Sequence, residues 1–370
     1  MKIGIDASRA FLGHRTGIEE YSYQVIKHLR DKLKKHQLVL YLRKGQRDRI
    51  DFNLPDNWSV KEIKFPRFWT QMGLSLEMIL NPVDVLFVPA HTVPVFHAKK
   101  TVVVIHGLEY EFLPKAYSFW ERLYMRHSIK NSCRWASDVI SVSKNTKKDL
   151  ISLYEVSEDK IDVIYEGYDS QIEKRKSNDV LNRFGLVDGK PEDPWLYVLF
   201  IGRIEERKNI EGIVEAFEVL KKEDEIYHKL VLAGKGGFGY KKILKRIEES
   251  EFRDDIILTG FVSEEEKWEL LKKAELFLFP TFYEGFGIPI LESQSVGTPV
   301  LASNNSSIPE VVNGSAVLVD PSDTIELESG IRNILMSEKL RSSLSEKGLE
   351  NVKRFSWDNC TREIAEILRK

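Results

Sequence analysis

Short apolar runs alternate with amphipathic stretches along the whole of this chain. The runs are rich in Val, Ile and Leu, and small or polar residues close each of them. In the first half they occupy 2–7, 38–43, 84–89, 101–106 and 138–143. Such runs are typical of strands buried on both faces, because helices cover both sides of a parallel sheet. The alternation therefore predicts an α/β fold with a doubly wound parallel sheet.

The same pattern starts again in the second half. The second series of runs occupies 195–202, 229–234, 255–260, 276–281, 299–303 and 316–320. Helical spacing is found at 17–35, 143–154, 209–222, 239–250, 263–274 and 287–296. Ser143 or Asn145 is expected to cap the helix in 143–154. Two series of this length predict two doubly wound domains.

A polar, charged stretch, 168–194, separates the two series and holds several Gly and Pro residues. We therefore predict one Rossmann-like domain at 1–175 and another at 190–356, with the C-terminal helix 357–370 packed back on the first. Ligands of such sheets bind beyond the carboxyl ends of the strands, so the two domains are expected to face a central cleft.

Composition excludes several classes of protein. Hydrophobic residues make up 42% and charged residues 30% of the 370, as in ordinary globular proteins. No run approaches the ~18 apolar residues that a membrane span requires. The N-terminus shows no signal-peptide pattern, and Cys133 and Cys360 are far apart without metal-ligand neighbours. A cytoplasmic setting is therefore expected.

The net charge of −2 does not suggest a nucleic-acid partner, but the charge is uneven. Residues 1–170 are net positive, and within 27–49 only Asp31 and Asp48 are acidic among many Lys and Arg. One hypothesis is that this basic stretch contacts anionic lipid at the inner face of a membrane. The alternative is a solvated helix and strand edge.

The stretch FPTFYEGFGIPILESQSVGTPV, residues 279–300, combines an apolar strand, a glycine turn and an apolar helix. Pro289 suits the first turn of a helix, and Gly285 and Gly287 let a ligand approach the backbone. The N–H groups of Phe286, Gly287 and Ile288 would then point outward at the positive end of a helix dipole. This arrangement predicts an anion site suited to a diphosphate.

Glu284 and Glu292 stand on either side of this turn, with seven residues between them. We expect Glu284 on the loop and Glu292 in the first turn of the helix, where both can accept hydrogen bonds from sugar or ribose hydroxyls. The alternative is purely structural, because a glutamate near a helix N-terminus is stabilising by about 0.3–1 kcal/mol in any case.

Arg203 and Lys208 follow the first strand of the second series, in FIGRIEERKN. The carboxyl end of that strand is the ligand side of such a sheet, so the two cations can neutralise a diphosphate there. The alternative is that they are surface charges paired with Glu205 and Glu206.

Three further motifs have simpler interpretations. Gly234, Gly236 and Gly239 have the spacing of a dinucleotide fingerprint, but they follow the second strand of their domain, which favours a loop at the edge of the nucleotide over NAD binding. Ser307 and Glu310 form a predicted capping box.

The segment 64–80 could present aromatic residues to a lipid or sugar chain, or it could bury them in the core. Burial in the core is slightly favoured. The aromatic residues of this segment are Phe65, Phe68 and Trp69.

Taken together, these motifs resemble the retaining glycosyltransferases of the GT-B group known as family 4. The resemblance includes Arg203, Lys208 and EGFGIPILE, and it extends to KIGIDASRAFLGHRTGIEEY, VVVIHGLEYEFLP, DVISVSKNTKKDLISLY, VIYEGYD, LASNNSSIPEVV and RFSWDNCTREIAEIL. The resemblance covers nearly the whole chain. The combination is highly specific, although each piece alone is only moderately so.

The resemblance implies roles for the matching positions. Arg203 and Lys208 would hold the donor diphosphate, Glu292 the donor ribose, and Glu284 the hydroxyls of the transferred sugar. His106, which could otherwise be an ordinary core histidine, would lie at the reacting sugar. The backbone of the donor site would come from Gly17, Gly234, Phe286, Gly287 and Ile288. Two positions depart from the family pattern: Gly107 stands where many relatives have Asp, and Glu166 precedes Gly167 where relatives often have Asn.

The implied activity is a metal-independent, retaining hexosyl transfer that needs no cofactor besides the nucleotide-sugar donor. No Asp-x-Asp occurs in the chain to bridge a metal to the diphosphate. GDP-mannose is the favoured donor, with a UDP-sugar next, and the expected acceptor is a saccharide or lipid-linked saccharide in polysaccharide biosynthesis. The alternatives are a GT-B epimerase or phosphorylase, and a non-catalytic nucleotide-sugar-binding protein.

Overall fold

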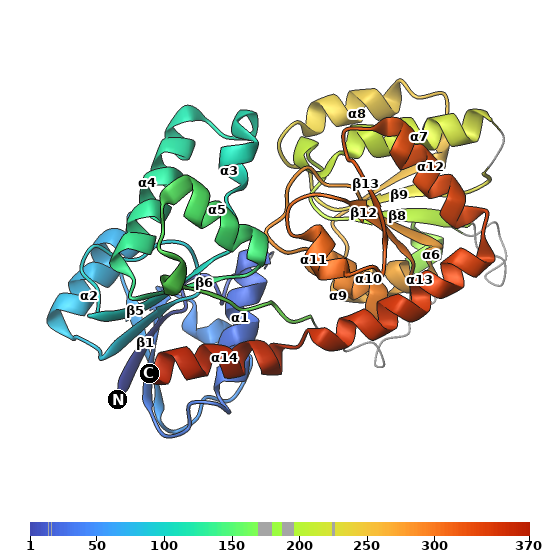
Figure 1. Ribbon diagram of the computed structural model, residues 1–370. Helices are drawn as coiled ribbons and strands as arrows, with labels where there is room; N and C mark the ends of the chain where they lie inside the picture. Colours follow the sequence, from blue (N-terminus) through green and yellow to red (C-terminus); the bar gives the residue numbers. More distant parts are fainter. Residues whose placement is uncertain (14, 16, 169–179, 187–195, 224–225) are drawn as a thin grey trace. The chain divides into compact units, whose positions relative to one another are not determined.

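The computed structural model describes residues 1–370 except 14, 16, 169–179, 187–195 and 224–225 (Figure 1). Its contacts divide the chain into two units. The first comprises Met1–Gly167 and Phe355–Lys370, and the second comprises Tyr168–Arg354.

The first unit contains a seven-stranded sheet in the order β3-β2-β1-β4-β5-β6-β7, in which every strand pair is parallel. The strand order reverses between β1 and β4, which is where ligands bind in sheets of this type. The strands are β1 (Lys2–Asp6), β2 (Gln37–Arg43), β3 (Trp58–Ile63), β4 (Val85–Val88), β5 (Lys100–Ile105), β6 (Asp138–Ser141) and β7 (Ile161–Val163).

Helices cover both faces of this sheet. Residues of α2, α4 and α5 share one apolar core with the strands, whereas α1 packs against α14. The α-helices are α1 (Gly17–Leu29), α2 (Ser75–Leu80), α3 (Glu109–Phe112), α4 (Phe119–Trp135), α5 (Lys144–Tyr154) and α14 (Trp357–Arg369). The short helical segments are η1 (Arg47–Arg49), η2 (Trp69–Leu74), η3 (Pro114–Ala116) and η4 (Glu158–Lys160).

The second unit has a six-stranded parallel sheet in the order β10-β9-β8-β11-β12-β13. Figure 1 shows α7, α8 and α12 on one face and α9, α10 and α13 on the other. The strands are β8 (Tyr197–Ile201), β9 (Lys229–Ala233), β10 (Ile256–Gly260), β11 (Leu276–Phe279), β12 (Val300–Ser303) and β13 (Val317–Val319).

The helical segments of the second unit connect these strands and extend beyond them. They are α6 (Val180–Arg183), η6 (Glu206–Lys208), α7 (Ile210–Lys222), α8 (Tyr240–Glu248), η7 (Arg253–Asp255), α9 (Glu264–Lys273), α10 (Ile288–Ser295), α11 (Ile308–Val312), α12 (Thr324–Leu335), α13 (Glu338–Asn351) and η8 (Val352–Arg354). Among the described residues, no helix has the length and apolar character needed to span a membrane.

The prediction of two doubly wound parallel sheets is confirmed, and each predicted apolar run contains a strand. Strands β3 and β7 were not predicted, because β3 alternates buried and exposed residues at a sheet edge and β7 has only three residues. The Ser143 side chain accepts a hydrogen bond from Thr146 N–H, so Ser143 is the cap of α5.

Several boundaries differ from the prediction. Helix α1 ends at Leu29 rather than continuing to 35. The predicted linker lies largely outside the described residues, but Val180, Leu181 and Leu186 within it are buried in the core of the second unit. In the segment 64–80, Trp69 is buried, Phe65 packs on the core, and Phe68 is exposed, so the preference for core is correct for two of the three aromatic residues.

Glycine is required at position 167 because two backbone segments of the first unit approach each other closely there. A Cβ at this position would lie 2.2 Å from the backbone nitrogen of Trp357, at the start of α14. Neither segment can yield by turning a side chain, so any side chain at position 167 must displace the start of α14.

We predict that Gly167→Ala destabilises the first unit by about 1–3 kcal/mol, the usual cost of overpacking a tight site. Urea unfolding of the full chain, followed by tryptophan fluorescence, measures the change. Gly13→Ala is the control, because the nearest atom to a Cβ there is an Arg49 side-chain nitrogen at 3.7 Å. Equal unfolding midpoints for the two variants would contradict the prediction.

Candidate functional site

The loop between β11 and α10 is built around Gly287. This residue caps α10 with φ of 116°, a conformation that glycine adopts readily and other residues rarely do. A Cβ there would also lie 3.0 Å from Ile308 Cδ1. Pro289 occupies the first turn of α10, as expected. Gly287 is itself buried, so a side chain at this position would be both strained and crowded.

The N–H groups of Gly287 and Ile288 donate to no acceptor among the described residues, as is usual in the first turn of a helix. They lie at the positive end of the α10 dipole. Together these properties make the loop suitable for binding an anionic group.

The segment that follows β12 supports this loop. The Ser307 hydroxyl lies 2.9 Å from the carbonyl oxygens of both Glu284 and Phe286, and the Ser306 hydroxyl accepts a hydrogen bond from the Glu284 N–H at 3.1 Å. The predicted capping box of Ser307 and Glu310 is therefore wrong. The Ser307 side chain makes no cap to α11, because its hydroxyl is turned to the glycine loop instead.

Glu284 lies in a buried cluster of charges. Its Oε1 accepts hydrogen bonds from Lys208 Nζ and, at 2.9 Å, from Arg207 Nη1. Arg207 also donates to Glu205 Oε1 at 2.9 Å and to the Tyr283 carbonyl oxygen at 2.8 Å. Two cations from the loop after β8 thus meet the carboxylate from the loop after β11, as adjacent parallel strands allow.

The cluster shifts the protonation of its members. Burial raises the pKa of Glu284, but the charges of Arg207 and Lys208 outweigh it, so this pKa lies below its ordinary value. Burial lowers the pKa of Lys208, the Arg207 charge lowers it further, and Glu284 offsets this only in part. Glu284 is therefore held as a carboxylate in a site where a single charge would be costly.

The structure brings together Lys208 and Glu284, whereas among the described residues no ion pair joins Arg203 to Glu284. Arg203 is exposed, and its side-chain stem lies across Gly237, where a Cβ would be 2.7 Å from Arg203 Cδ. The second cation that contacts Glu284, besides Lys208, is Arg207, which the sequence analysis missed. Arg207 could have been identified from the sequence, because it directly precedes Lys208.

Glu292 is in the second turn of α10, and the expectation of a place in the first turn was wrong. Its Oε1 accepts a hydrogen bond from Lys267 Nζ at 2.7 Å, and Lys267 also pairs with Glu264 at 2.8 Å. Burial lowers the pKa of Lys267, but the two carboxylates raise it above its ordinary value. Lys267 therefore provides a permanent positive charge beside Glu292.

The glycine motif after β9 interlocks with the loop that carries Arg203 and Lys208. Gly234 has φ of 146°, and a Cβ on it would lie 1.7 Å from the Gly202 carbonyl oxygen. Ile204 N–H donates to the Lys235 carbonyl at 2.9 Å, and Gly239, with φ of 77°, lies against the Glu206 side chain. Close packing therefore explains these glycines, which agrees with a loop rather than a dinucleotide fingerprint.

In the first unit, His106 follows the end of β5 and is held on both sides. Its Nδ1 lies 3.2 Å from Glu166 Oε1, and its Nε2 lies 2.9 Å from the Pro89 carbonyl oxygen. The Glu166 carboxylate and the Pro89 carbonyl therefore fix the orientation of the imidazole ring from its two nitrogens. Glu166, one of the two departures from the family pattern, is thus the partner of His106.

The remaining predicted positions of the first unit have structural explanations. Gly107 has φ of 153°, which glycine adopts more easily than the Asp of relatives. Gly17 is the first residue of α1, at φ of 32°, with open space where a Cβ would be.

A cavity of about 450 Å³ lies at the carboxyl edge of the first sheet. It is lined by Asp6, Arg9, Arg43, Trp69 and His91 among others. The sequence analysis had named Trp69, as an aromatic residue for the core or for a lipid or sugar chain, but not the four polar residues. Burial raises the pKa of Asp6, and the Arg43 guanidinium lies over the Trp69 ring. The cavity has the volume of a small-ligand site and a mixed polar and aromatic lining.

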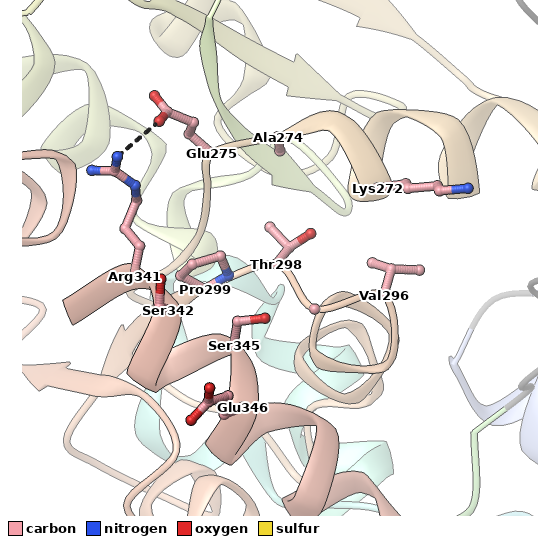
Figure 2. Close-up of a pocket in the computed structure, with 11 residues that line it drawn as sticks. Lys272, Ala274, Glu275, Val296, Thr298, Pro299, Arg341, Ser342, Ser345 and Glu346 are labelled. Carbon is pink, nitrogen blue, oxygen red and sulfur yellow. Dashed lines mark ion pairs between the residues drawn. The ribbon is translucent and has the colours of Figure 1, made fainter. Parts of the chain in front are cut away.

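A second hollow, of about 410 Å³, belongs to the opposite edge of the second sheet. Figure 2 shows it between the ends of α9 and α10 and helix α13, with Arg341 paired to Glu275 at 3.4 Å. It lies by the amino ends of β11 and β12, whereas Glu284 and Gly287 follow the carboxyl end of β11. It is therefore not part of the candidate site.

Comparison with known families gives two matches that together cover most of the chain. The family described as Glycosyltransferase Family 4 matches residues 15–172, and the family described as Glycosyl transferases group 1 matches residues 187–351.

Among curated proteins, the O-antigen chain mannosyltransferase B of Escherichia coli is 30% identical over 72% of this chain and 69% of its own length. The O-antigen chain mannosyltransferase RfbU of Salmonella typhimurium is 26% identical over 75% of this chain and 71% of its own.

Two solved structures illustrate the fold. Sucrose-phosphate synthase from Thermosynechococcus elongatus has a TM-score of 0.77 at 19% identity, covering 100% of this chain and 98% of that one. Anabaena Alr3699/HepE with UDP and glucose has a TM-score of 0.74 at 18% identity, covering 100% and 99%. At this identity the likeness establishes the fold alone, which is the predicted GT-B fold.

His91 provides a test of the site in the first unit. Its Nε2 accepts a hydrogen bond from the His106 backbone N–H at 3.0 Å. Burial, with a smaller contribution from the charge of His106, lowers its pKa from 6.5 to about 3. His91 is therefore neutral when folded but takes up a proton below pH 6.5 when unfolded, so its contribution to stability falls as the pH falls from 6.5 to about 3.

We predict that His91→Gln, which keeps an acceptor but does not titrate, reduces the loss of stability on acidification. The wild-type contribution approaches about 1.4 kcal/mol per pH unit within this window. Urea unfolding at a series of pH values measures the slope. His127→Gln, at an exposed position on α4, should retain the wild-type slope. The same slope in H91Q and wild type would show that His91 is not buried as a neutral group.

Proposed function

This chain belongs to the glycosyltransferases of group 1 and family 4, and from that membership we propose that it is a retaining hexosyltransferase whose donor is a nucleotide-diphosphate sugar. GDP-mannose is the first candidate, because the relatives compared above are mannosyltransferases, and a UDP-sugar is the second. The proposed acceptor is a saccharide or lipid-linked saccharide, in line with the O-antigen relatives.

The observation that carries the proposal is the cluster of Glu284, Lys208 and Arg207 near the start of α10, where the N–H groups of Gly287 and Ile288 donate to no acceptor among the described residues. A nucleotide-diphosphate sugar carries an anionic diphosphate next to a ring of hydroxyl groups. The cations and the start of α10 can bind the diphosphate, and the carboxylate can accept hydrogen bonds from the hydroxyl groups. The match of both kinds of group within one loop cluster favours this ligand class.

We propose the following roles in the second unit. The diphosphate binds Lys208, the exposed Arg203 and the N–H groups of Phe286, Gly287 and Ile288. Glu284 accepts hydrogen bonds from the transferred sugar. Glu292, which is paired with Lys267, accepts hydrogen bonds from the ribose hydroxyls. Arg207 is added here as a positioning residue that holds Glu284 and neutralises part of its charge.

Transfer then depends on electrostatic stabilisation of the leaving group. As the bond to the sugar breaks, negative charge grows on the diphosphate, and fixed cations and backbone amides stabilise it without reorganising. These groups take the place of a metal ion in our proposal. A same-face attack, in which the departing phosphate accepts the proton of the acceptor hydroxyl, gives retention without a protein nucleophile.

For the acceptor we propose the cavity of the first unit, lined by Asp6, Arg9 and Arg43. Its volume suits one or two sugar rings, and its carboxylate and guanidinium groups can bond to hydroxyls. From the family resemblance we propose that His106, which is held by Glu166, contacts the reacting sugar.

Binding of the donor is the first test. We predict that GDP-mannose raises the melting temperature more than UDP-glucose, UDP-galactose or UDP-N-acetylglucosamine, and that excess EDTA does not reduce the shift. At a ligand concentration about 100 times Kd the stabilisation is about 2.7 kcal/mol. A larger melting shift with a UDP-sugar would change only the donor assigned in the proposal. If neither the nucleotides GDP, UDP and ADP nor their sugars shifted the transition, the glycosyltransferase proposal would fail.

Turnover of the charge-cluster variants is the second test. We predict that Glu284→Gln and Lys208→Met each lower the rate of sugar transfer, measured without added phosphate, by about 10²–10³, the usual effect of losing one electrostatic contact. Isosteric variants are preferred because they leave no cavity. Each still leaves a buried charge without its partner, which costs about 3–5 kcal/mol of stability, so folding must be checked.

The matched control is Glu218→Gln, which breaks the ion pair with Arg246 elsewhere in the second unit. This variant should keep the wild-type rate. Circular dichroism checks that every variant is folded. A folded E284Q or K208M with the wild-type rate would rule out the assigned roles, and sugar transfer that required phosphate would indicate a phosphorylase.

A further inference from the structure

Tyr21 of α1 packs against the ring of His106. The two ring centroids are 4.5 Å apart and the ring planes meet at 83°, an edge-to-face geometry that aromatic pairs favour. The contacts with Glu166 and the Pro89 carbonyl hold the two ring nitrogens of His106. Rotation of the ring about the line between these nitrogens is opposed by the groups that pack against it, and Tyr21 is one of them.

The Tyr21 ring is itself fixed in the core. Its side chain has no exposed surface, and Val25, one turn further along the same side of α1, is fully buried as well. Because protein interiors are close-packed, a fully buried ring has little freedom to turn away from its neighbours. The place of the His106 ring is therefore coupled to the packing of α1.

The hydroxyl group of Tyr21 contributes less than its ring. It is buried and makes no well-formed hydrogen bond among the described residues. Burial raises the pKa of Tyr21 well above its ordinary value, and the neighbouring Cys360 and Glu166 raise it further, so the hydroxyl is neutral. A thiol is only a weak hydrogen-bond partner. We therefore expect phenylalanine to pack against His106 as well as tyrosine does.

Trp357, the first residue of the C-terminal helix α14, supports both groups that hold His106 (Figure 1). Its ring centroid is 5.8 Å from that of Tyr21, with the ring planes at 67°. Its backbone nitrogen lies against Gly167, where a Cβ would be 2.2 Å away, and Gly167 directly follows Glu166. One residue of α14 thus contacts Tyr21 through its ring and the Glu166 loop through its backbone.

We propose that Tyr21 is a positioning residue for His106, and that Trp357 holds Tyr21 and the Glu166 loop in place. The C-terminal helix is thereby a support of the candidate site as well as part of the fold of the first unit. The effect on sugar transfer rests on the proposed function, whereas the effect on the His106 ring does not.

Steady-state kinetics give the first test. We expect Tyr21→Leu to lower kcat for sugar transfer by about 10- to 100-fold, because misplacing a reacting group by about 1 Å has an effect of this size. The donor KM should change little, because the proposed diphosphate contacts of the second unit are intact. Tyr21→Phe should restore the wild-type kcat, and Trp357→Leu should lower kcat in the same direction.

A double-mutant cycle separates positioning from general loss of stability. If Tyr21 acts through His106, Tyr21→Leu has no further effect on kcat once His106 is replaced in His106→Ala. The matched control is Trp58→Leu, which removes a buried aromatic side chain at the amino end of the edge strand β3. This variant should keep the wild-type kcat. Circular dichroism checks that every variant is folded.

Nitrogen NMR of the full chain labelled with ¹⁵N-histidine gives a test that does not depend on activity. The ring signals of His106 are those missing from His106→Ala. Imidazole nitrogen shifts depend on hydrogen bonding and hardly on ring currents from a neighbouring aromatic residue. We expect the His106 signals to move or broaden in Y21L and W357L and to stay at the wild-type positions in Y21F and W58L.

Two outcomes overturn the proposal: unchanged His106 ring signals in folded Y21L, or an equal loss of kcat from Y21L with and without His106. If Y21L does not fold, W357L supplies the same NMR comparison. A wild-type chain that transfers sugar from no donor would refute the proposed function instead, and the NMR comparison would still decide whether Tyr21 positions His106.

Discussion

The contact of Glu284 with Lys208 and Arg207 is the interaction on which the candidate site depends. A carboxylate in this buried position is stable only because two cations from the neighbouring loop compensate its charge. The same contact fixes the loop after β8 against the loop after β11. It thereby positions the basic residues relative to the start of α10, so one contact both neutralises the Glu284 charge and fixes the geometry of the site.

Backbone packing keeps this arrangement rigid. The turn after β9 lies so close to the turn after β8 that a side chain on Gly234 would collide with the Gly202 carbonyl. The Ser306 and Ser307 hydroxyls fix the backbone on the other side of Glu284. Preorganisation of this kind is what electrostatic stabilisation of a leaving group requires, because the protein then does no work of reorganisation during the reaction.

The first unit has the same kind of fold but a different site at the carboxyl edge of its sheet. This edge holds a cavity and a histidine fixed by Glu166 and Pro89. The departures from the family pattern become understandable here. Gly167 is required by the backbone of Trp357, and Glu166 supplies the partner of His106, so both neighbours in YEGYD have local reasons for their identity.

The sequence alone determined the two parallel sheets, because a strand buried on both faces must be apolar at every position and helices between strands must be amphipathic. It also identified Lys208, Glu284 and the Gly287 turn as one group, since the carboxyl ends of adjacent strands meet at one edge. The sequence did not predict the edge strands β3 and β7, because a strand at the edge of a sheet does not require continuous apolar residues. Tertiary structure alone decided that Arg207 rather than Arg203 contacts Glu284, that Ser307 bonds to the glycine loop, and that Trp69 is buried while Phe68 is exposed. Each of these depends on which way a side chain leaves a loop, and that direction is set by contacts between residues far apart in the chain.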